Sequence, residues 1–281
     1  MAAHKKLRVL IPLDGTNPGQ SALEAMPPLA RTGPVECTLL HVAESAETAH
    51  GPEAWLSPHR EALESIGIPT RVRIVTGNPS EEILRQASGG EIDLVAMSTH
   101  GRQGMDRVLM GSVAEEVFRS SSVPTLLCRR GFRVPAWEHI VVALSGLTEA
   151  EEVLDDVLVL ARRLGSTVHL VQVGLNLLRS NAYRGVAFNV PAEESPRYLD
   201  DIAARFTGEG IPVTTDHRCG MAAIEIARFA KELKAGLICL TTHGYPEEMP
   251  GLDRSVAAEV IRQAPCPVYV RRMTPSPCRA R

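Results

Sequence analysis

Short apolar runs alternate with amphipathic segments along most of the chain. An apolar run at residues 94–97 is followed by a polar loop that contains glycine, an amphipathic segment, and a second apolar run at 124–128. Within the amphipathic segment the apolar residues recur at the spacing of one helix face. They are Val113, Ala114, Val117 and Phe118. The pattern predicts a strand, a loop, a helix and a strand.

The same alternation fills the residues before this stretch. It predicts strands at 9–13, 38–42 and 71–75, and helices at 18–31, near 58–66 and from Pro79 onward. The Pro27-Pro28 pair is expected to end or kink the first helix early. Strands that alternate with helices indicate a parallel sheet covered on both faces. In such sheets, ligands bind beyond the carboxyl ends of the strands, where the strand order reverses.

The loop after residues 94–97 carries the candidate chemistry. It opens with the letters STHG, of which Gly101 is the last, and it closes at Gly111 and Ser112, with nine residues between the two glycines. Ser112 falls at the start of the predicted helix, where unpaired N–H groups and a partial positive charge favour a phosphate. A second interpretation is a capping box, in which Ser112 and Glu115 serve only their own helix. No Gly-Lys-Ser/Thr follows, so this is not a Walker loop.

The stretch occurs twice, which makes the chain a tandem duplication. Residues 93–129 align with 236–272 at an offset of 143, so that Ser112 pairs with Ser255. Nearer the start of each half the offset is 131, because residues 140–146 match 9–15. The rise from 131 to 143 places twelve extra residues within 175–212. This insertion is open to two interpretations, a surface insertion that packs on its own domain, or a lid or contact surface.

The duplication also predicts the domain organisation. We expect one domain at 1–131, a second at 137–273, and a tail at 274–281. A length of 281 residues with 44% hydrophobic residues is enough for two cores. The connector at 129–138 is short, so the halves are predicted to pack as a pseudo-twofold pair, with the final strands at 124–128 and 267–270 as the meeting edge.

Composition narrows the choice of partners. A net charge of −3 gives no bulk attraction to nucleic acid or to an anionic membrane, so neither is expected as a partner. No stretch approaches the roughly 18 apolar residues of a membrane span, and the first apolar run is too short for a signal peptide, so a cytoplasmic protein is expected. The six cysteines show no CxxC spacing and the nine histidines no HExxH motif, so no metal site is predicted.

From residue 9 to residue 272 the two copies resemble the universal stress protein family in its tandem form. The most specific part is the loop, where the family pattern is Gly-x-x-Gly, nine residues, Gly, then Ser or Thr. The resemblance implies two flavodoxin-like (Rossmann-like) α/β domains, each a five-stranded parallel sheet of order 3-2-1-4-5 with helices on both faces. It also implies a regulatory role in stress response, ATP or another adenine nucleotide as ligand with Mg²⁺ as an optional companion, a homodimer, and a regulatory protein partner of unknown identity.

The resemblance further implies which residues bind the nucleotide. Asp14 would contact the base or the ribose, Val42 would line the adenine pocket, and the glycine loop would wrap the phosphates. The full set of implied contacts is Asp14, Val42, Met97, Ser98, Gly101, Gly111, Ser112 and Val113. Arg102 joins them as a loop arginine able to neutralise phosphate charge.

The sequence departs from the family pattern mainly in the second half. In the first half, Ser98 stands where the family has the first loop glycine. The second half has more departures than the first. Ser145 replaces Asp14, Thr241 replaces Ser98, Met221-Ala222 replaces Asn78-Pro79 and Arg254 replaces Gly111. The bulk and the restricted backbone of Arg254 are expected to close the phosphate approach, so we predict one nucleotide per chain, held by the first half.

The sequence is also compatible with two other function classes. A slow ATPase or phosphotransferase would need a base and a charge clamp, for which Asp106, Glu115 and Arg102 are the nearest candidates. No obligatory catalytic set is present, so we predict no catalytic residues and at most weak ATP hydrolysis. The third class is an interaction scaffold in which neither half binds nucleotide.

Overall fold

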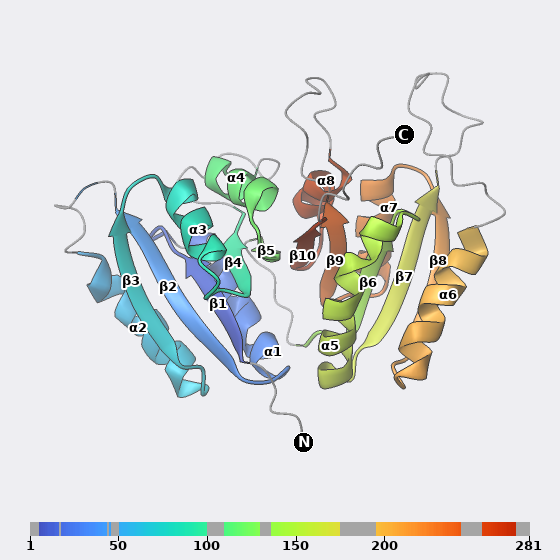
Figure 1. The fold of residues 1–281 in the computed structure, drawn as a ribbon, viewed down its shortest axis with the longest axis horizontal. Helices are drawn as coiled ribbons and strands as arrows, with labels where there is room; N and C mark the ends of the chain where they lie inside the picture. Colours follow the sequence, from blue (N-terminus) through green and yellow to red (C-terminus); the bar gives the residue numbers. More distant parts are fainter. Residues whose placement is uncertain are drawn as a thin grey trace.

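The computed structural model describes residues 6–16, 18–43, 45, 51–99, 110–129, 136–174, 195–242 and 255–273 (Figure 1). The first half contains β1 (Leu7–Pro12), η1 (Pro18–Ala25), α1 (Met26–Ala30), β2 (Val35–Ala43), α2 (Pro52–Ser65), β3 (Thr70–Thr76), α3 (Pro79–Ser88), β4 (Leu94–Ser98), α4 (Ser112–Ser120) and β5 (Thr125–Cys128). The second half contains β6 (His139–Leu144), η3 (Thr148–Val153), α5 (Leu154–Leu164), β7 (Thr167–Gly174), α6 (Ser195–Gly208), β8 (Val213–Cys219), α7 (Ala222–Glu232), β9 (Leu237–Thr242), α8 (Val256–Gln263) and β10 (Val268–Arg272).

Each half forms the predicted sheet. The strand order is β3-β2-β1-β4-β5 in the first half and β8-β7-β6-β9-β10 in the second, with parallel pairing inside each half. The 3-2-1-4-5 order is therefore confirmed. In this order the chain leaves β1 in one direction and returns beside it as β4, so the carboxyl ends of these two strands form the switch point.

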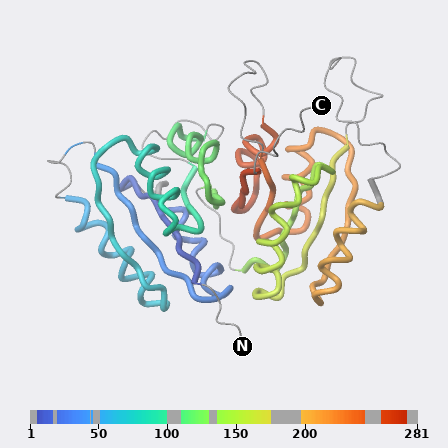
Figure 2. The backbone as a smooth tube through the Cα atoms, viewed as in Figure 1, coloured from blue at the N-terminus to red at the C-terminus, as the bar shows by residue number. Residues whose placement is uncertain are grey.

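The two sheets join into one. β5 pairs antiparallel with β10, with Leu127 opposite Val268 and Leu126 opposite Tyr269. The result is a continuous ten-stranded sheet whose centre is the seam between the halves. Figure 2 shows the first half and the second half side by side on either side of this seam. The predicted meeting edge is confirmed. Two arginines cross the seam in opposite directions, because Arg129 donates to the Arg262 carbonyl at 2.5 Å and Arg272 donates to the Ser120 carbonyl at 3.4 Å.

Helices cover both faces of the sheet, and each face has its own core. One core includes Leu63 of α2, Val157 of α5 and Phe206 of α6. The other includes Val117 of α4 and Phe229 of α7. Both cores run across the two halves, so the duplication buries its strands as a single layered unit.

Two predicted helices differ from those observed. Residues 18–31 form η1 and then the short α1, in which the Pro27-Pro28 pair stands in the first turn. A proline costs nothing there, because the first N–H groups of a helix have no intrahelical acceptor. The helix predicted near 58–66 begins at Pro52, and Pro58 lies inside it on the exposed side. Its early start follows from the apolar face that Pro52, Leu56 and Leu63 bury together.

The observed elements narrow the position of the insertion. β2 ends at Ala43 and β7 at Gly174, which is still the offset of 131, whereas α2 and α6 begin at Pro52 and Ser195, which is the offset of 143. The twelve extra residues therefore lie within 175–194, between β7 and α6. Those residues fall outside the described part of the chain. The structure therefore does not distinguish between the two interpretations of the insertion.

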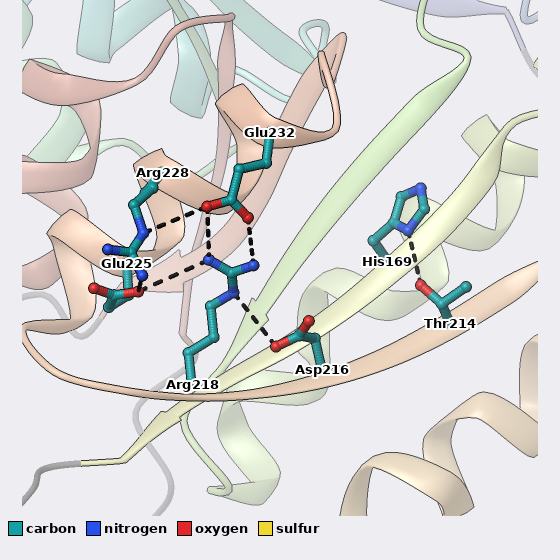
Figure 3. A network of polar contacts seen from close by, with 7 residues as sticks. All are labelled: His169, Thr214, Asp216, Arg218, Glu225, Arg228 and Glu232. Carbon is teal, nitrogen blue, oxygen red and sulfur yellow. Dashed lines mark hydrogen bonds and ion pairs between the residues drawn. The ribbon is translucent and has the colours of Figure 1, made fainter.

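The outer strand of the second half is held to α7 by an ion-pair network. Figure 3 shows the Arg218 side chain of β8 among three carboxylates. Its guanidinium lies 2.5 Å from Glu232, 3.3 Å from Asp216 and 3.8 Å from Glu225. The same guanidinium lies over the Phe229 ring at 4.3 Å from its centroid. These contacts neutralise the charge of a side chain that is only 16% exposed.

Candidate functional site

Asp14 lies in a tight turn just beyond β1. Its Oδ1 atom accepts hydrogen bonds from the backbone N–H of Thr16 at 2.9 Å and from the Thr16 hydroxyl at 2.7 Å. Gly15, between the two, has a φ of 82°, which favours glycine. The Asp14 side chain is half-buried. The sequence Asp-Gly-Thr therefore folds into a turn that fixes a carboxylate at the carboxyl end of the sheet.

Two neighbouring strands bring further predicted residues to this end. Pro12 of β1 lies opposite Leu40 of β2, so the same register continued by two residues puts Asp14 level with Val42. On the other side of β1, β4 ends at Ser98, which is buried and accepts a hydrogen bond from the Ala22 N–H at 3.3 Å. Asp14, Val42 and Ser98 thus lie at or near the carboxyl ends of three adjacent strands, at one edge of the sheet.

The start of α4 reaches the same edge. The Thr99 N–H donates to the Cys128 carbonyl at 2.9 Å, and the Gly111 N–H donates to the Thr99 carbonyl at 2.8 Å. These two bonds bring the far end of the loop back to the end of β4. α4 begins at Ser112, as predicted, with Val113 half-buried beside it. Met97, one residue before the end of β4, is buried in the core beneath α4.

The first turn of α4 presents unpaired donors. Within the described part of the chain, the N–H groups of Ser112, Val113 and Ala114 have no hydrogen-bond acceptor, and the Ser112 hydroxyl is exposed and makes no hydrogen bond. The capping-box interpretation is therefore wrong for this half, because Gly111 is the cap residue and offers no side chain. Three converging N–H groups and the helix dipole favour an anion at this position.

The backbone at Gly111 corrects one prediction. Its φ of −63° and ψ of 146° are values that any residue adopts, and an added Cβ would meet only the Thr99 carbonyl at 3.5 Å, an ordinary contact. The expectation that a restricted backbone excludes Arg254 from the equivalent position is therefore wrong. The argument from the bulk of the arginine side chain is independent of the backbone. Arg254 itself lies outside the described residues.

The equivalent edge of the second half is built differently. Ser255 is the cap residue of α8, and its hydroxyl accepts a hydrogen bond from the Ala258 N–H at 3.4 Å. Ser145 holds its turn through one bond, from the Leu147 N–H at 3.4 Å, in place of the two bonds that Asp14 accepts. The second edge therefore lacks the carboxylate, and its own serine occupies a donor of the helix start.

The start of α3 also differs between the halves. Asn78 caps α3 by accepting from the Ser80 N–H at 3.0 Å and from the Glu81 N–H at 3.3 Å. The Ser80 hydroxyl donates to Glu116 of α4 at 2.5 Å, which ties the two helices together beside the site. Met221, at the equivalent position before α7, forms no cap bond and is 64% exposed. The polar support of the helix start is thus confined to the first half.

Three of the predicted participants, Gly101, Arg102 and Asp106, lie outside the described residues. The sequence pattern did not indicate His41 or Trp55, which lie beside the Asp14 turn. Trp55 was not identified because the predicted helix began after it.

Among the described residues, no group of three or more His, Cys, Asp or Glu side chains is arranged to hold a metal ion. In the same part of the chain, no helix has both the length and the apolar character that crossing a membrane requires.

The buried cysteines do not add chemistry to this edge. Burial raises the pKa of the Cys37 thiol to about 12 and raises the pKa of the Cys128 thiol further. Thiols with a raised pKa are protonated near neutral pH and are weak nucleophiles. The described groups at this edge are a carboxylate, small polar side chains and backbone N–H donors.

Two flavodoxin-like domains joined edge to edge into one sheet define a class of tandem α/β proteins. Within that class, the chain belongs to the universal stress protein family, whose sequence model matches residues 7–129 and 136–272.

Individual relatives match one half at a time. Universal stress protein MJ0577 of Methanocaldococcus jannaschii is 35% identical over 71 residues, which are 25% of this chain and 44% of that protein. Universal stress protein YxiE of Bacillus subtilis is 25% identical over 145 residues, which are 43% of this chain and 98% of that protein. The chain thus spans less than half the length of MJ0577.

Solved structures match the whole duplication. A universal stress protein from Archaeoglobus fulgidus superposes with a TM-score of 0.79 at 21% identity, over 94% of this chain and 98% of that one. A putative universal stress protein from Pseudomonas aeruginosa gives a TM-score of 0.70 at 15% identity, over 97% of this chain and 95% of that one. These two likenesses show the tandem fold.

Proposed function

We propose that the chain is a regulatory protein of the stress response that binds one adenine nucleotide, ATP, in its first half. The observation that carries the proposal is the contrast between the two helix starts. α4 offers unpaired N–H donors, whereas the equivalent serine of α8 caps its own helix. The family resemblance supplies the identity of the anion as a nucleotide phosphate.

In this proposal the residues divide by the part of the ligand that they contact. Asp14 accepts hydrogen bonds from the ribose or the base, and Val42 packs against the adenine. The N–H groups of Ser112 and Val113 bind the phosphates, together with the loop that contains Gly101 and Arg102. Mg²⁺, when present, accompanies the phosphates, because the described residues offer no cluster of metal ligands of their own.

The proposal extends to organisation and location. The domain division at 1–131 and 137–273 with a tail at 274–281, a cytoplasmic location, a regulatory protein partner and a homodimer are all parts of it. A homodimer would need a surface other than the β5 edge, because β5 already pairs with β10 within the chain. Light scattering tests the dimer. A homodimer should have about twice the chain mass of 30.4 kDa.

A thermal-shift experiment tests the binding. Protein freed of any co-purified ligand is heated with and without ATP and Mg²⁺, and a ligand that binds only the folded state raises the melting temperature as its concentration rises. A melting temperature that does not change at millimolar ATP would overturn the proposal. ADP release, followed on the same sample, distinguishes regulation from catalysis. We expect about one turnover per hour or fewer, far below the usual range of enzymes.

A further inference from the structure

An aromatic side chain packs directly on the Asp14 turn. Trp55, near the start of α2, is half-buried. A Cβ added to Gly15 would lie 3.4 Å from Trp55 Cζ2 and 3.5 Å from Cε2, so the indole lies over the backbone of the residue that follows Asp14. The φ of 82° favours glycine at this position, and the indole lies at ordinary van der Waals distance from where a Cβ would stand.

His41 holds the indole and the turn together. The His41 ring meets Trp55 edge to face, with centroids 5.2 Å apart and planes at 90°. His41 Nδ1 lies 2.8 Å from the Leu13 carbonyl oxygen, and because a carbonyl only accepts, Nδ1 carries the proton and donates. Leu13, Gly15, His41 and Trp55 form a closed set of contacts, which we call the Trp55 bracket. It contacts the residues on both sides of Asp14, which are Leu13 and Gly15.

The second half keeps the fold but changes the bracket. At the positions equivalent to Asp14, His41 and Trp55 it has Ser145, Gln172 and Tyr198. The histidine and the tryptophan therefore change together with the carboxylate. Both halves form the same five-stranded sheet, so this sheet does not by itself require the residues of the bracket. His41 and Trp55 occur in the half that also has Asp14.

We propose that Trp55 is a positioning residue of the nucleotide site, which fixes the turn that carries Asp14 and thereby sets the affinity for nucleotide. A ligand group that meets a preset carboxylate loses less binding free energy to ordering than one that meets a mobile turn. Trp55 acts through Asp14 and needs no contact with the ligand. The inference rests on the proposed function, since it assigns Asp14 to nucleotide binding.

The test compares Trp55→Phe in two backgrounds. Phenylalanine keeps an aromatic ring in α2 but is too short to cover Gly15. In otherwise wild-type protein, calorimetry with ATP should give a dissociation constant raised about tenfold, whereas in Asp14→Asn protein the same substitution should raise it less than twofold. His41→Gln should reproduce the effect of Trp55→Phe. The matched control, Tyr198→Phe in the second half, should leave the dissociation constant unchanged.

The possible results distinguish a failure of the positioning role of Trp55 from a failure of nucleotide binding. Wild-type binding with an equal loss in both backgrounds, or with no loss from Trp55→Phe, overturns the positioning role and leaves the proposed function standing. Wild-type protein that binds no ATP overturns the proposed function itself. If Trp55→Phe does not fold, Trp55→Tyr, the residue that the second half carries, takes its place in the same cycle with the same expectation.

Discussion

Ser112 and Ser255 occupy equivalent positions in the two halves, yet only Ser255 caps its own helix. The Ser255 hydroxyl accepts from the Ala258 N–H, whereas the Ser112 hydroxyl is exposed at the first residue of α4. The same residue type thus stabilises a helix in one half and stands at an open helix start in the other. The difference is the strongest indication in the described structure that the halves have separate tasks.

Alanine at these two serines should give opposite results. Ser255→Ala removes a helix cap and should lower the free energy of unfolding by about 0.5–1 kcal/mol without changing the affinity for ATP. Ser112→Ala removes no cap, so it should leave stability unchanged and weaken ATP binding severalfold. Urea denaturation and calorimetry on both variants make the comparison. Equal stability losses would mean that Ser112 is a capping residue after all.

Removal of the carboxylate should affect binding far more than folding. Asp14→Ala deletes the acceptor of a charge-assisted hydrogen bond to the ligand, a loss of about 1.5–3 kcal/mol, or roughly 10- to 150-fold in the dissociation constant. The circular dichroism spectrum should stay that of the wild type. Ser145→Ala is the control at the matched position, and it should bind ATP normally. Wild-type affinity in Asp14→Ala would show that the ligand lies elsewhere.

A side chain at the helix start should block the phosphate. The backbone of Gly111 tolerates any residue, so Gly111→Arg should fold, and its arginine should abolish or strongly weaken ATP binding. Gly111→Ala adds only a Cβ in ordinary contact and should retain most of the affinity. Calorimetry distinguishes the two variants. If Gly111→Arg binds more tightly than wild type, its charge matters more than its bulk, and the argument against a second site fails.

Stability should fall as the solution becomes mildly acidic. Burial, aided by the neighbouring His139, lowers the pKa of His169, whose Nδ1 lies 2.8 Å from the Thr214 hydroxyl (Figure 3). Because the folded pKa lies below the ordinary value of 6.5, the unfolded state binds the proton more readily. His169 therefore contributes stability that is present above pH 6.5 and is lost as the pH falls below it toward the folded pKa.

The measurement is urea denaturation of wild type and His169→Gln between pH 7.5 and 5, a window chosen around the ordinary pKa of about 6.5. Below pH 6.5, the free energy of unfolding of the wild type should fall by up to about 1.4 kcal/mol per pH unit more than that of the variant. His59→Asn serves as the reference, because burial also lowers the pKa of His59 in the first half. If the free energy of unfolding depends on pH in the same way in wild type and in His169→Gln, His169 is not the source of the pH dependence.

The repeat explains why so much of the fold was predictable from the sequence. Two copies of one pattern fixed the alternation of strands and helices, and the short connector left β5 and β10 as the natural meeting edge. Local propensity failed where tertiary packing decided. Pro52 starts α2 well before the predicted boundary because Leu56 and Leu63 bury one face, and the Pro27-Pro28 pair begins a helix where it was expected to end one.

The site was predictable only in part. Spacing identified the start of α4 and the Asp14 turn, because both are read from neighbouring residues. It missed Trp55 and His41, which meet Gly15 and Leu13 only after α2 and β2 have packed. It also assigned Gly111 a conformational need that the observed φ of −63° does not support. Sequence patterns give local geometry, whereas contacts between distant elements need the fold.

In the proposed function, the first half of the chain binds nucleotide and the second half does not. Calorimetric titration of ligand-free wild-type protein with ATP tests it most directly, through the number of sites per chain. We expect saturation at one equivalent, with an affinity that Asp14→Ala lowers roughly 10- to 150-fold and Ser145→Ala leaves unchanged. Saturation at two equivalents would contradict the account, because it would mean that the half with Ser255 as its helix cap binds nucleotide as well.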